Sequence, residues 1–188
     1  MLGLPFFVKP ANLGSSVGIN KVSRPSEFRA AIDDAFRYDN KIILEEAIRG
    51  REIECSVLGN EKPIASLPGE IIVQHEFYSY DAKYIDDQGA RFEIPARLPK
   101  RIIQEIQHTA VRVFRVLCCE GMGRVDFFLR PNGQVLVNEI NTIPGFTKIS
   151  MYPKMWEVSG LSYSRLIDRL IELALQRWRK EKRLKSSK

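Results

Sequence analysis

Two carboxylates, Asp126 and Glu139, are spaced so that a hairpin would place them directly opposite each other. The dipeptide Asn132-Gly133 between them predicts a two-residue type I′ turn. In that register Arg124 lies opposite Asn141, and side chains two positions apart on a strand share a face of the sheet. The hairpin therefore predicts one face that carries two carboxylates, one amide and one arginine.

Carboxylates that face each other across a strand pair repel, and a hard cation would remove this conflict. Asp126, Glu139 and the amide oxygen of Asn141 suit Mg²⁺, which keeps water and phosphate oxygens as its other ligands. In the predicted register the same face also carries Phe128 and Val137, so it is partly apolar. The alternatives are that the two carboxylates are solvated residues at a sheet edge, or that a longer loop shifts the register.

The segment from Lys9 to Gly18 is a second candidate for chemistry. It is rich in small residues, and its backbone N–H groups and the hydroxyls of Ser15 and Ser16 are suited to wrap phosphate oxygens. Lys9, at the end of a predicted strand, would add a positive charge. The segment matches neither the Walker A pattern nor the GxGxxG fingerprint. Its structural alternative is a plain hairpin loop.

The apolar pattern predicts a mixed α+β fold with mostly antiparallel strands around these segments. Short apolar or alternating runs predict strands at 6–8, 19–22, 42–44, 52–58, 71–73, 125–129 and 135–140. Helical spacing predicts a helix that begins at 23–25, a second over 99–117 and a third over 162–178. The polar segment 78–90 is expected to be a long loop.

The composition limits the class of protein. A length of 188 residues with 44% hydrophobic residues suits one domain with a real core. No apolar stretch is long enough to span a bilayer, and the first residues lack the pattern of a signal peptide. The three cysteines form no CxxC pair, which argues against a disulfide framework or a thiolate zinc site and favours the cytoplasm. We therefore expect no membrane partner.

The net charge of +6 lies at one end of the chain. Residues 177–188 hold seven basic side chains against Glu181, which accounts for the whole excess. A basic tail that continues a last helix complements the helix dipole. No stacking motif or recognition helix accompanies the charge, so we expect no nucleic-acid partner.

Four motifs, in order along the chain, resemble those of D-alanine–D-alanine ligases, which are ATP-grasp enzymes. They lie at 8–18, 78–84, 123–126 and 138–147, and 150–153 continues the last match. The likeness extends to about residue 176. It implies an α+β fold, the C-terminal part of an ATP-grasp enzyme, with a truncated lid subdomain and a mostly antiparallel sheet with flanking helices. It also implies one domain over 1–176, followed by a basic tail over 177–188.

The resemblance implies an ATP-dependent carboxylate–amine ligase that uses ATP and two Mg²⁺ ions, or Mn²⁺ in their place. ATP would phosphorylate the carboxylate of a first D-alanine, and the amine of a second D-alanine would attack the acylphosphate and release phosphate. The dipeptide would serve peptidoglycan synthesis in the cytoplasm. Relatives that make D-alanyl-D-lactate carry a histidine in place of the segment 80–84, so a dipeptide product is expected.

Each site residue of the family has a counterpart by position. The resemblance assigns to ATP the residues that would meet its phosphates (Lys9, Ser16, Lys83), its adenine (Glu45, Ile48, Phe77, Phe128) or its ribose (Glu52). It assigns the metal to Asp126, Glu139 and Asn141. The remaining assignments are stabilisation of the oxyanion (Arg124 and the Gly145 amide), binding of the second D-alanine carboxylate (Ser150) and closure of segment 78–84 over the site (Ser15 and Tyr84).

Several of these residues also have a structural reading. Phe77 and Phe128 could be core residues, Glu45 a solvated strand end, and Arg124 a structural partner of Asp126. A complete family member has, in addition, an N-terminal substrate domain and the front of the grasp domain, which this sequence does not contain. The chain alone is therefore expected to lack substantial ligase activity and to need that N-terminal half, or a full-length ligase, as partner besides D-alanine and ATP. The alternatives are a non-catalytic remnant or interaction module, or another ligase of the same type.

Overall fold

The computed structural model describes residues 2–14, 16–73 and 90–184. The chain divides into two compact units. The small unit comprises Met1–Arg49 and Val73–Arg91, and the large unit comprises Gly50–Ile72 and Phe92–Lys188. Each unit is described by itself below.

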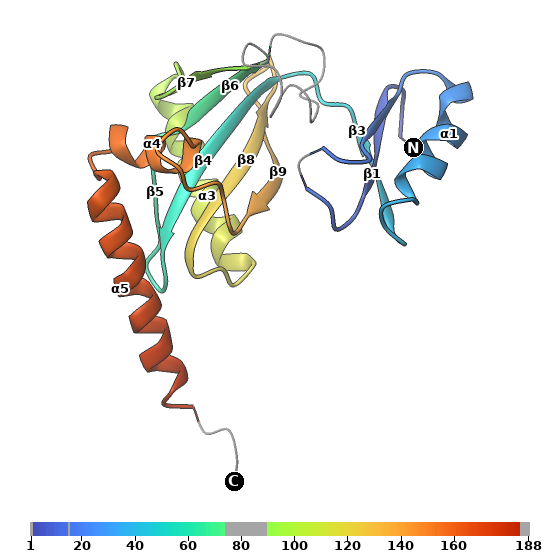
Figure 1. The fold of residues 1–188 in the computed structure, drawn as a ribbon. Helices are drawn as coiled ribbons and strands as arrows, with labels where there is room; N and C mark the ends of the chain where they lie inside the picture. The colour runs from blue at the N-terminus through green and yellow to red at the C-terminus, as the bar shows by residue number, and fades with distance from the viewer. Residues whose placement is uncertain (1, 15, 74–89, 185–188) are drawn as a thin grey trace. The chain divides into compact units, whose positions relative to one another are not determined.

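The small unit is a three-stranded antiparallel sheet with one helix (Figure 1). Its elements are β1 (Phe6–Pro10), β2 (Asn20–Val22), a 3-10 turn (Pro25–Glu27), α1 (Phe28–Ala35) and β3 (Ile42–Glu46), with the strand order β2-β1-β3. Val8 and Val22 on the sheet pack against Ala31 and Ala35 of α1, and all four are buried. The predicted strands are confirmed, and the first helix begins with the 3-10 turn at Pro25.

The large unit is built around one sheet, and β4 is the central strand of that sheet. Its strands are β4 (Arg51–Gly59), β5 (Ile64–Ala65), β6 (Gly69–Val73), β7 (Ala90–Glu93), β8 (Gly121–Leu129) and β9 (Val135–Asn141). Their order is β7-β6-β4-β8-β9, with β5 paired to β4. The pairs β4–β6, β4–β8 and β8–β9 are antiparallel. The candidate metal ligands therefore lie on β8, which is the neighbour of β4, and on β9, which is the next strand.

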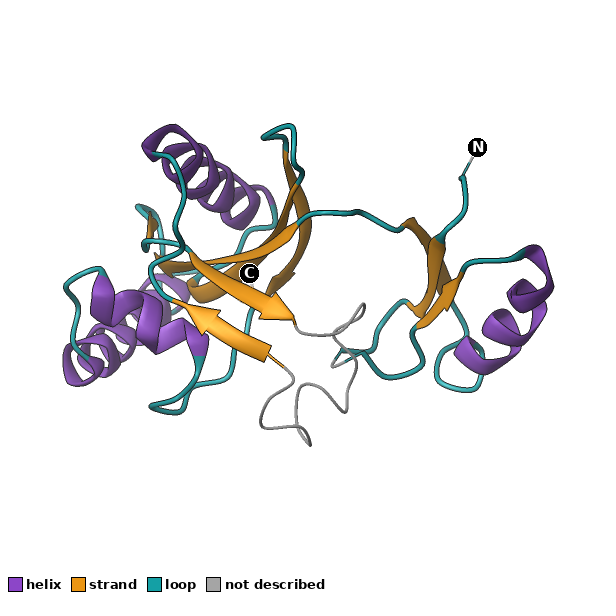
Figure 2. Ribbon diagram, turned by 90° about the horizontal axis from the view of Figure 1, so that it is seen from above, coloured by secondary structure: helices purple, strands orange, loops and turns teal. Residues whose placement is uncertain are grey.

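Helix α3 (Lys100–Val116) covers one face of this sheet (Figures 1 and 2). Its buried side chains, Ile106, Ala110 and Phe114, recur every four residues and so lie on one side of the helix. They pack against alternate residues of β4 and β8, such as Ile53 and Val125. The apolar spacing that predicted a helix over 99–117 thus also indicated its buried side.

Two further helices, α4 (Met151–Val158) and α5 (Tyr163–Glu181), pack near one end of the opposite face. Their contact cluster is Leu58, Tyr152, Trp156, Leu166 and Leu173. The sequence predicted the last helix over 162–178, and it extends to Glu181. The sequence pattern did not predict α4, which has only eight residues and carries Pro153 in its first turn. Proline is tolerated there because the backbone N–H groups of the first turn have no partner within the helix.

The turn between β8 and β9 differs from the predicted two-residue loop. Leu129 pairs with Val135, the Gly133 N–H donates to the Arg130 carbonyl at 2.9 Å, and Gly133 has φ +84. This is a three-residue loop with glycine in the left-handed region, the second commonest hairpin connection. Proline after Arg130 fits the start of such a turn.

A β-bulge at Asn138 then restores the predicted pairing at the site. Asp126 pairs with Glu139, but Phe127 pairs with Val137, so the partner strand has one extra residue. The predicted opposition of Asp126 and Glu139 is confirmed, since the longer loop and the bulge compensate for each other. The predicted place of Val137 is wrong, because its partner Phe127 lies on the α3 face, away from Asp126.

Cys55 on β4 is fully buried, and burial raises the pKa of its thiol to about 12 although the thiol contacts the Ser66 carbonyl. The unfolded thiol ionises from its ordinary pKa of 9.0, whereas the folded thiol stays protonated. At pH values between these two pKa values the folded state binds more protons than the unfolded state. Raising the pH in this range must therefore lower the free energy of unfolding, by at most about 1.4 kcal/mol per pH unit. In urea unfolding from pH 8 to 10.5, the free energy of unfolding should therefore fall more steeply with pH for the natural chain than for Cys55→Ala. An equal dependence on pH in the two proteins would contradict the raised pKa of Cys55.

Candidate active site

Three carboxylates lie in a row across adjacent strands of the large unit, on the face opposite α3. The register pairs Glu54 on β4 with Asp126 on β8, and Asp126 with Glu139 on β9. Glu54 was not among the residues predicted from sequence. Its alternation with Glu52 on one strand was the available signal, because the two share a face, but only the β4–β8 pairing places it beside Asp126.

Arg124 neutralises part of this row. Its guanidinium donates to both Asp126 oxygens, Nε to Oδ1 and Nη2 to Oδ2, at 2.7 Å each. Its Nε also lies 3.2 Å from Oε1 of Glu54, whose side chain is only 6% exposed. Burial alone would lower the pKa of Arg124, but the hydrogen bonds and charge of Asp126, with the charges of Glu54 and Glu139, raise it overall. The structural pairing of Arg124 with Asp126 is therefore present.

The remaining predicted metal ligand, Asn141, ends β9 opposite Arg124. Its Oδ1 accepts a hydrogen bond from the Ile143 N–H at 3.1 Å, which fixes the amide orientation and leaves the oxygen a second lone pair. Among the described residues, no group of three His, Cys, Asp or Glu side chains is arranged to hold a metal ion. The oxygens of Asp126, Glu139 and Asn141 still form the kind of set that Mg²⁺ uses when phosphates complete its shell. To bind it, Asp126 would have to share its oxygens with Arg124.

Gly145 and Ser150, which were assigned to oxyanion and substrate binding, lie next to each other. A Cβ atom on Gly145 would sit 3.2 Å from Ser150 Oγ, so the glycine leaves space beside this hydroxyl. Ser150 immediately precedes α4, and its Oγ accepts from the Thr147 N–H at 3.0 Å and lies 2.9 Å from Thr147 Oγ1. The segment after β9 therefore folds into a compact polar turn.

Glu52 and Phe128, assigned to ribose and adenine, are cross-strand partners on β4 and β8. They stand on the same sheet face as Asp126, because Phe128 and Asp126 are two positions apart on β8. Phe128 is half-buried rather than part of the α3 core. The large unit thus gathers all the described residues that were assigned to ribose, metal and oxyanion.

The small unit brings together Lys9 and Glu45, both assigned to ATP. Lys9 Nζ lies 2.6 Å from Glu45 Oε2, and the two residues come from the paired strands β1 and β3. Ser16 has φ +60 within the turn that leads to β2, and Ile48 follows β3. Ser15, Phe77, Lys83 and Tyr84 lie outside the described residues.

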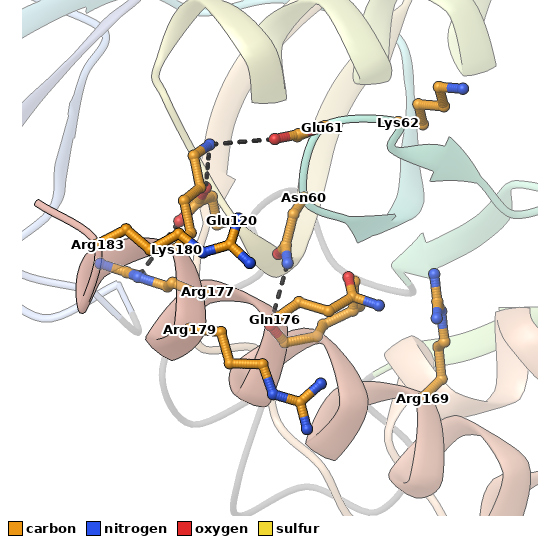
Figure 3. Close-up of a pocket in the computed structure, with 11 residues that line it drawn as sticks. Asn60, Glu61, Lys62, Glu120, Arg169, Gln176, Arg177, Arg179, Lys180 and Arg183 are labelled. Carbon is orange, nitrogen blue, oxygen red and sulfur yellow. Dashed lines mark hydrogen bonds and ion pairs between the residues drawn. The ribbon is translucent and has the colours of Figure 1, made fainter.

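A separate cavity of about 500 Å³ lies between α5 and the turn that joins β4 to β5 (Figure 3). Asn60 is one of the residues that line it, and it donates to the Leu173 carbonyl and accepts from the Gly121 N–H, each at 3.0 Å. Arg177 and Lys180 pair across it with Glu120, and Lys180 also pairs with Glu61. None of the predicted site residues lines it, and its lining carries more basic than acidic side chains.

Comparison with known proteins identifies the family. The family model described as D-ala D-ala ligase C-terminus matches residues 1–172. The chain belongs to this D-alanine–D-alanine ligase family. It is 60% identical to the D-alanine–D-alanine ligase of Shouchella clausii over 99% of its own length, and 54% identical to D-alanine–D-alanine ligase A of Escherichia coli K12. It spans about half the length of these curated relatives, 50% and 51%.

Solved structures of D-alanine ligases share the fold. The D-alanine-D-alanine ligase from Coxiella burnetii matches with a TM-score of 0.84 and 49% identity over 95% of this chain and 47% of that chain. The VanG D-Ala:D-Ser ligase from Enterococcus faecalis matches with a TM-score of 0.84 and 42% identity over 92% of this chain and 50% of that chain. The predicted fold, the C-terminal part of an ATP-grasp enzyme, is confirmed. No helix in the described ranges is long and apolar enough to cross a membrane.

Proposed function

We propose that this chain is the ATP- and Mg²⁺-binding part of a D-alanine–D-alanine ligase that acts in peptidoglycan synthesis in the cytoplasm. The observation that carries the proposal is the row of acidic side chains on the sheet face opposite α3, with Asn141 beside it and Arg124 within it. Like charges on facing strands destabilise a sheet, so the packing of the strands does not account for this row, whereas cation binding does. Family membership supports the same reading.

In this proposal the ATP and metal contacts are those that the family resemblance implies. Lys9, which pairs with Glu45, would hold phosphate oxygens, and Glu45 would contact the adenine. Glu52 with Phe128 would hold the ribose and adenine. Asp126, Glu139 and Asn141 would hold Mg²⁺, which offsets phosphate charge and orients the reacting groups. Lys83, Ser16, Ile48, Phe77, Ser15 and Tyr84 keep the roles that the family resemblance implies.

The same residues suggest how the ligation step is assisted. A tetrahedral intermediate carries negative charge on the former carboxylate oxygen, and a positioned cation and a backbone N–H stabilise such a charge. Arg124 and the Gly145 N–H are the groups proposed to do so. Ser150, beside Gly145 and held by Thr147, would bind the carboxylate of the second D-alanine. The amine of that substrate would then attack the acylphosphate, and phosphate would leave.

One observation favours the second candidate, a non-catalytic remnant. Arg124 already satisfies both oxygens of Asp126, so the row is partly neutralised without any metal. If Arg124 stays bound to Asp126 and a metal ion cannot reach the carboxylate, the chain would keep the residues of the family but not its ligand binding.

Titration with ATP, with and without Mg²⁺, distinguishes the two candidates. We expect ATP to raise the melting temperature only when Mg²⁺ is present, and Asp126→Ala/Glu139→Ala to abolish this shift, because the ligand oxygens are gone. A matched control, Glu61→Ala/Glu105→Ala, removes two exposed carboxylates outside the row and should leave the shift intact. No shift in the folded natural chain would favour the remnant.

A further inference from the structure

Helix α5 carries apolar residues on two sides. Its inner side, Leu166 and Leu173, is buried against Leu58, Tyr152 and Trp156 of the large unit. A second set lies along the helix at intervals of four, four and three residues and is 36–56% exposed: Ile167, Ile171, Leu175 and Trp178. These four residues are called the outer stripe.

The outer stripe points away from the rest of the large unit. With 3.6 residues per turn, its members fall on one side of α5, roughly 145° around the axis from the buried Leu166 and Leu173. In Figure 1 the C-terminal half of α5 also extends past the strands of its unit. Exposed apolar patches of this kind, rimmed by polar residues, mark sites of interaction with a protein or a membrane.

Positive charge surrounds the C-terminal half of this stripe. Residues 177–184 carry Arg177, Arg179, Lys180, Lys182 and Arg183 against Glu181. Arg177 and Lys180 pair with carboxylates, but among the described residues Arg179, Lys182 and Arg183 form no ion pair with a carboxylate. Lys182 instead lies over the Trp178 ring, with its Nζ 4.3 Å from the centroid. Two more lysines, at 185 and 188, follow in the sequence.

We propose that the outer stripe of α5 docks on the surface of an anionic lipid bilayer. The helix would lie in the plane of the headgroups, with Ile171, Leu175 and Trp178 in the acyl boundary and the adjoining cations against lipid phosphates. Tryptophan suits this position, since its ring is apolar and its N–H is polar. The expectation of no membrane partner rested on the lack of a spanning segment, and docking in the interface needs none. The proposal does not depend on the ligase function.

A second copy of the chain fits the stripe less well. Four apolar residues on one face of one helix fall short of the roughly 20–30 residues a side found in stable interfaces. A bilayer needs no matching shape, and its negative surface attracts the positive charge near the stripe. A second copy of the chain also has a net charge of +6, so it would repel that charge.

Vesicle binding of the 188-residue chain tests the proposal. We expect sedimentation with vesicles of equal parts phosphatidylglycerol and phosphatidylcholine, at least tenfold weaker binding to pure phosphatidylcholine, and a further tenfold loss between 50 and 300 mM salt. The chain has two tryptophans, and Trp156 is buried. In Trp156→Phe, the emission of Trp178 should therefore shift to the blue on the anionic vesicles only.

Two variants separate the contributions of the stripe and of the charge. Ile171→Ser/Leu175→Ser removes apolar side chains of the outer stripe, and Arg179→Ser/Arg183→Ser removes two cations near its C-terminal end. Each variant should therefore bind at least tenfold more weakly. Ile64→Ser and Arg29→Ser, exposed residues on β5 and α1, are the matched controls and should bind like the natural chain. All six substitutions in these four variants are at exposed positions, and unchanged melting curves would establish that the variants fold.

Three outcomes would overturn the proposal. The first is equal binding to both vesicle types. The second is loss of binding in the arginine variant alone, which would leave no role for the stripe. The third is no vesicle binding together with a dimer in sedimentation velocity that Ile171→Ser/Leu175→Ser dissociates, which would assign the stripe to a second copy.

Discussion

Replacing Arg124 by alanine is expected to destabilise the folded chain by about 3–5 kcal/mol. The side chain is 19% exposed and lies between Asp126 and Glu54, which are 15% and 6% exposed. Without the guanidinium, two poorly solvated carboxylates would face each other across β4 and β8 with no counter-charge. Urea denaturation followed by circular dichroism measures the loss.

Two comparisons make this expectation specific. Arg29, 87% exposed and paired with Asp33, is a matched surface arginine, and Arg29→Ala should cost less than about 1 kcal/mol. Adding Glu54→Gln to Arg124→Ala removes one of the uncompensated charges and should restore part of the stability. If Arg124→Ala costs no more than Arg29→Ala, the row of carboxylates is solvated and does not need Arg124 as its counter-charge.

Truncation of Tyr152 to alanine is expected to have a comparable effect, about 3–5 kcal/mol. Tyr152 lies in α4, its ring is fully buried in a cluster with Leu58 of β4, and its hydroxyl donates to the Val57 carbonyl at 2.9 Å. The Ser56 hydroxyl in turn donates to the Tyr152 carbonyl at 3.3 Å. These contacts hold the start of α4, and with it Ser150, against the sheet.

Tyr152→Phe separates packing from hydrogen bonding. It keeps the ring and removes only the hydroxyl, so it should cost about 1 kcal/mol. Thermal and urea unfolding of both variants provides the test. Equal losses would show that the hydrogen bond to Val57, and not the packing of the ring, anchors α4.

Local pattern in the sequence was enough to predict several elements. The four-residue spacing of apolar side chains in α3 determines both the helix and its buried side. The strict alternation of side chains along a strand places Arg124 with Asp126, and Glu139 with Asn141. Ordered motifs made the family recognisable, and the family comparison confirmed it.

Other features depend on contacts between residues far apart in the chain. Glu54 joins the acidic row only because β4 pairs with β8, some 70 residues later, and no local signal encodes that pairing. The bulge at Asn138 moved Val137 to the other face while leaving Glu139 in place, a balance that turn propensities do not reveal. The sequence therefore determined which residues could do chemistry and on which strand faces they stand. Only the tertiary structure decided that Arg124 is shared between Asp126 and Glu54, because burial and strand order, not sequence distance, set the charges that meet.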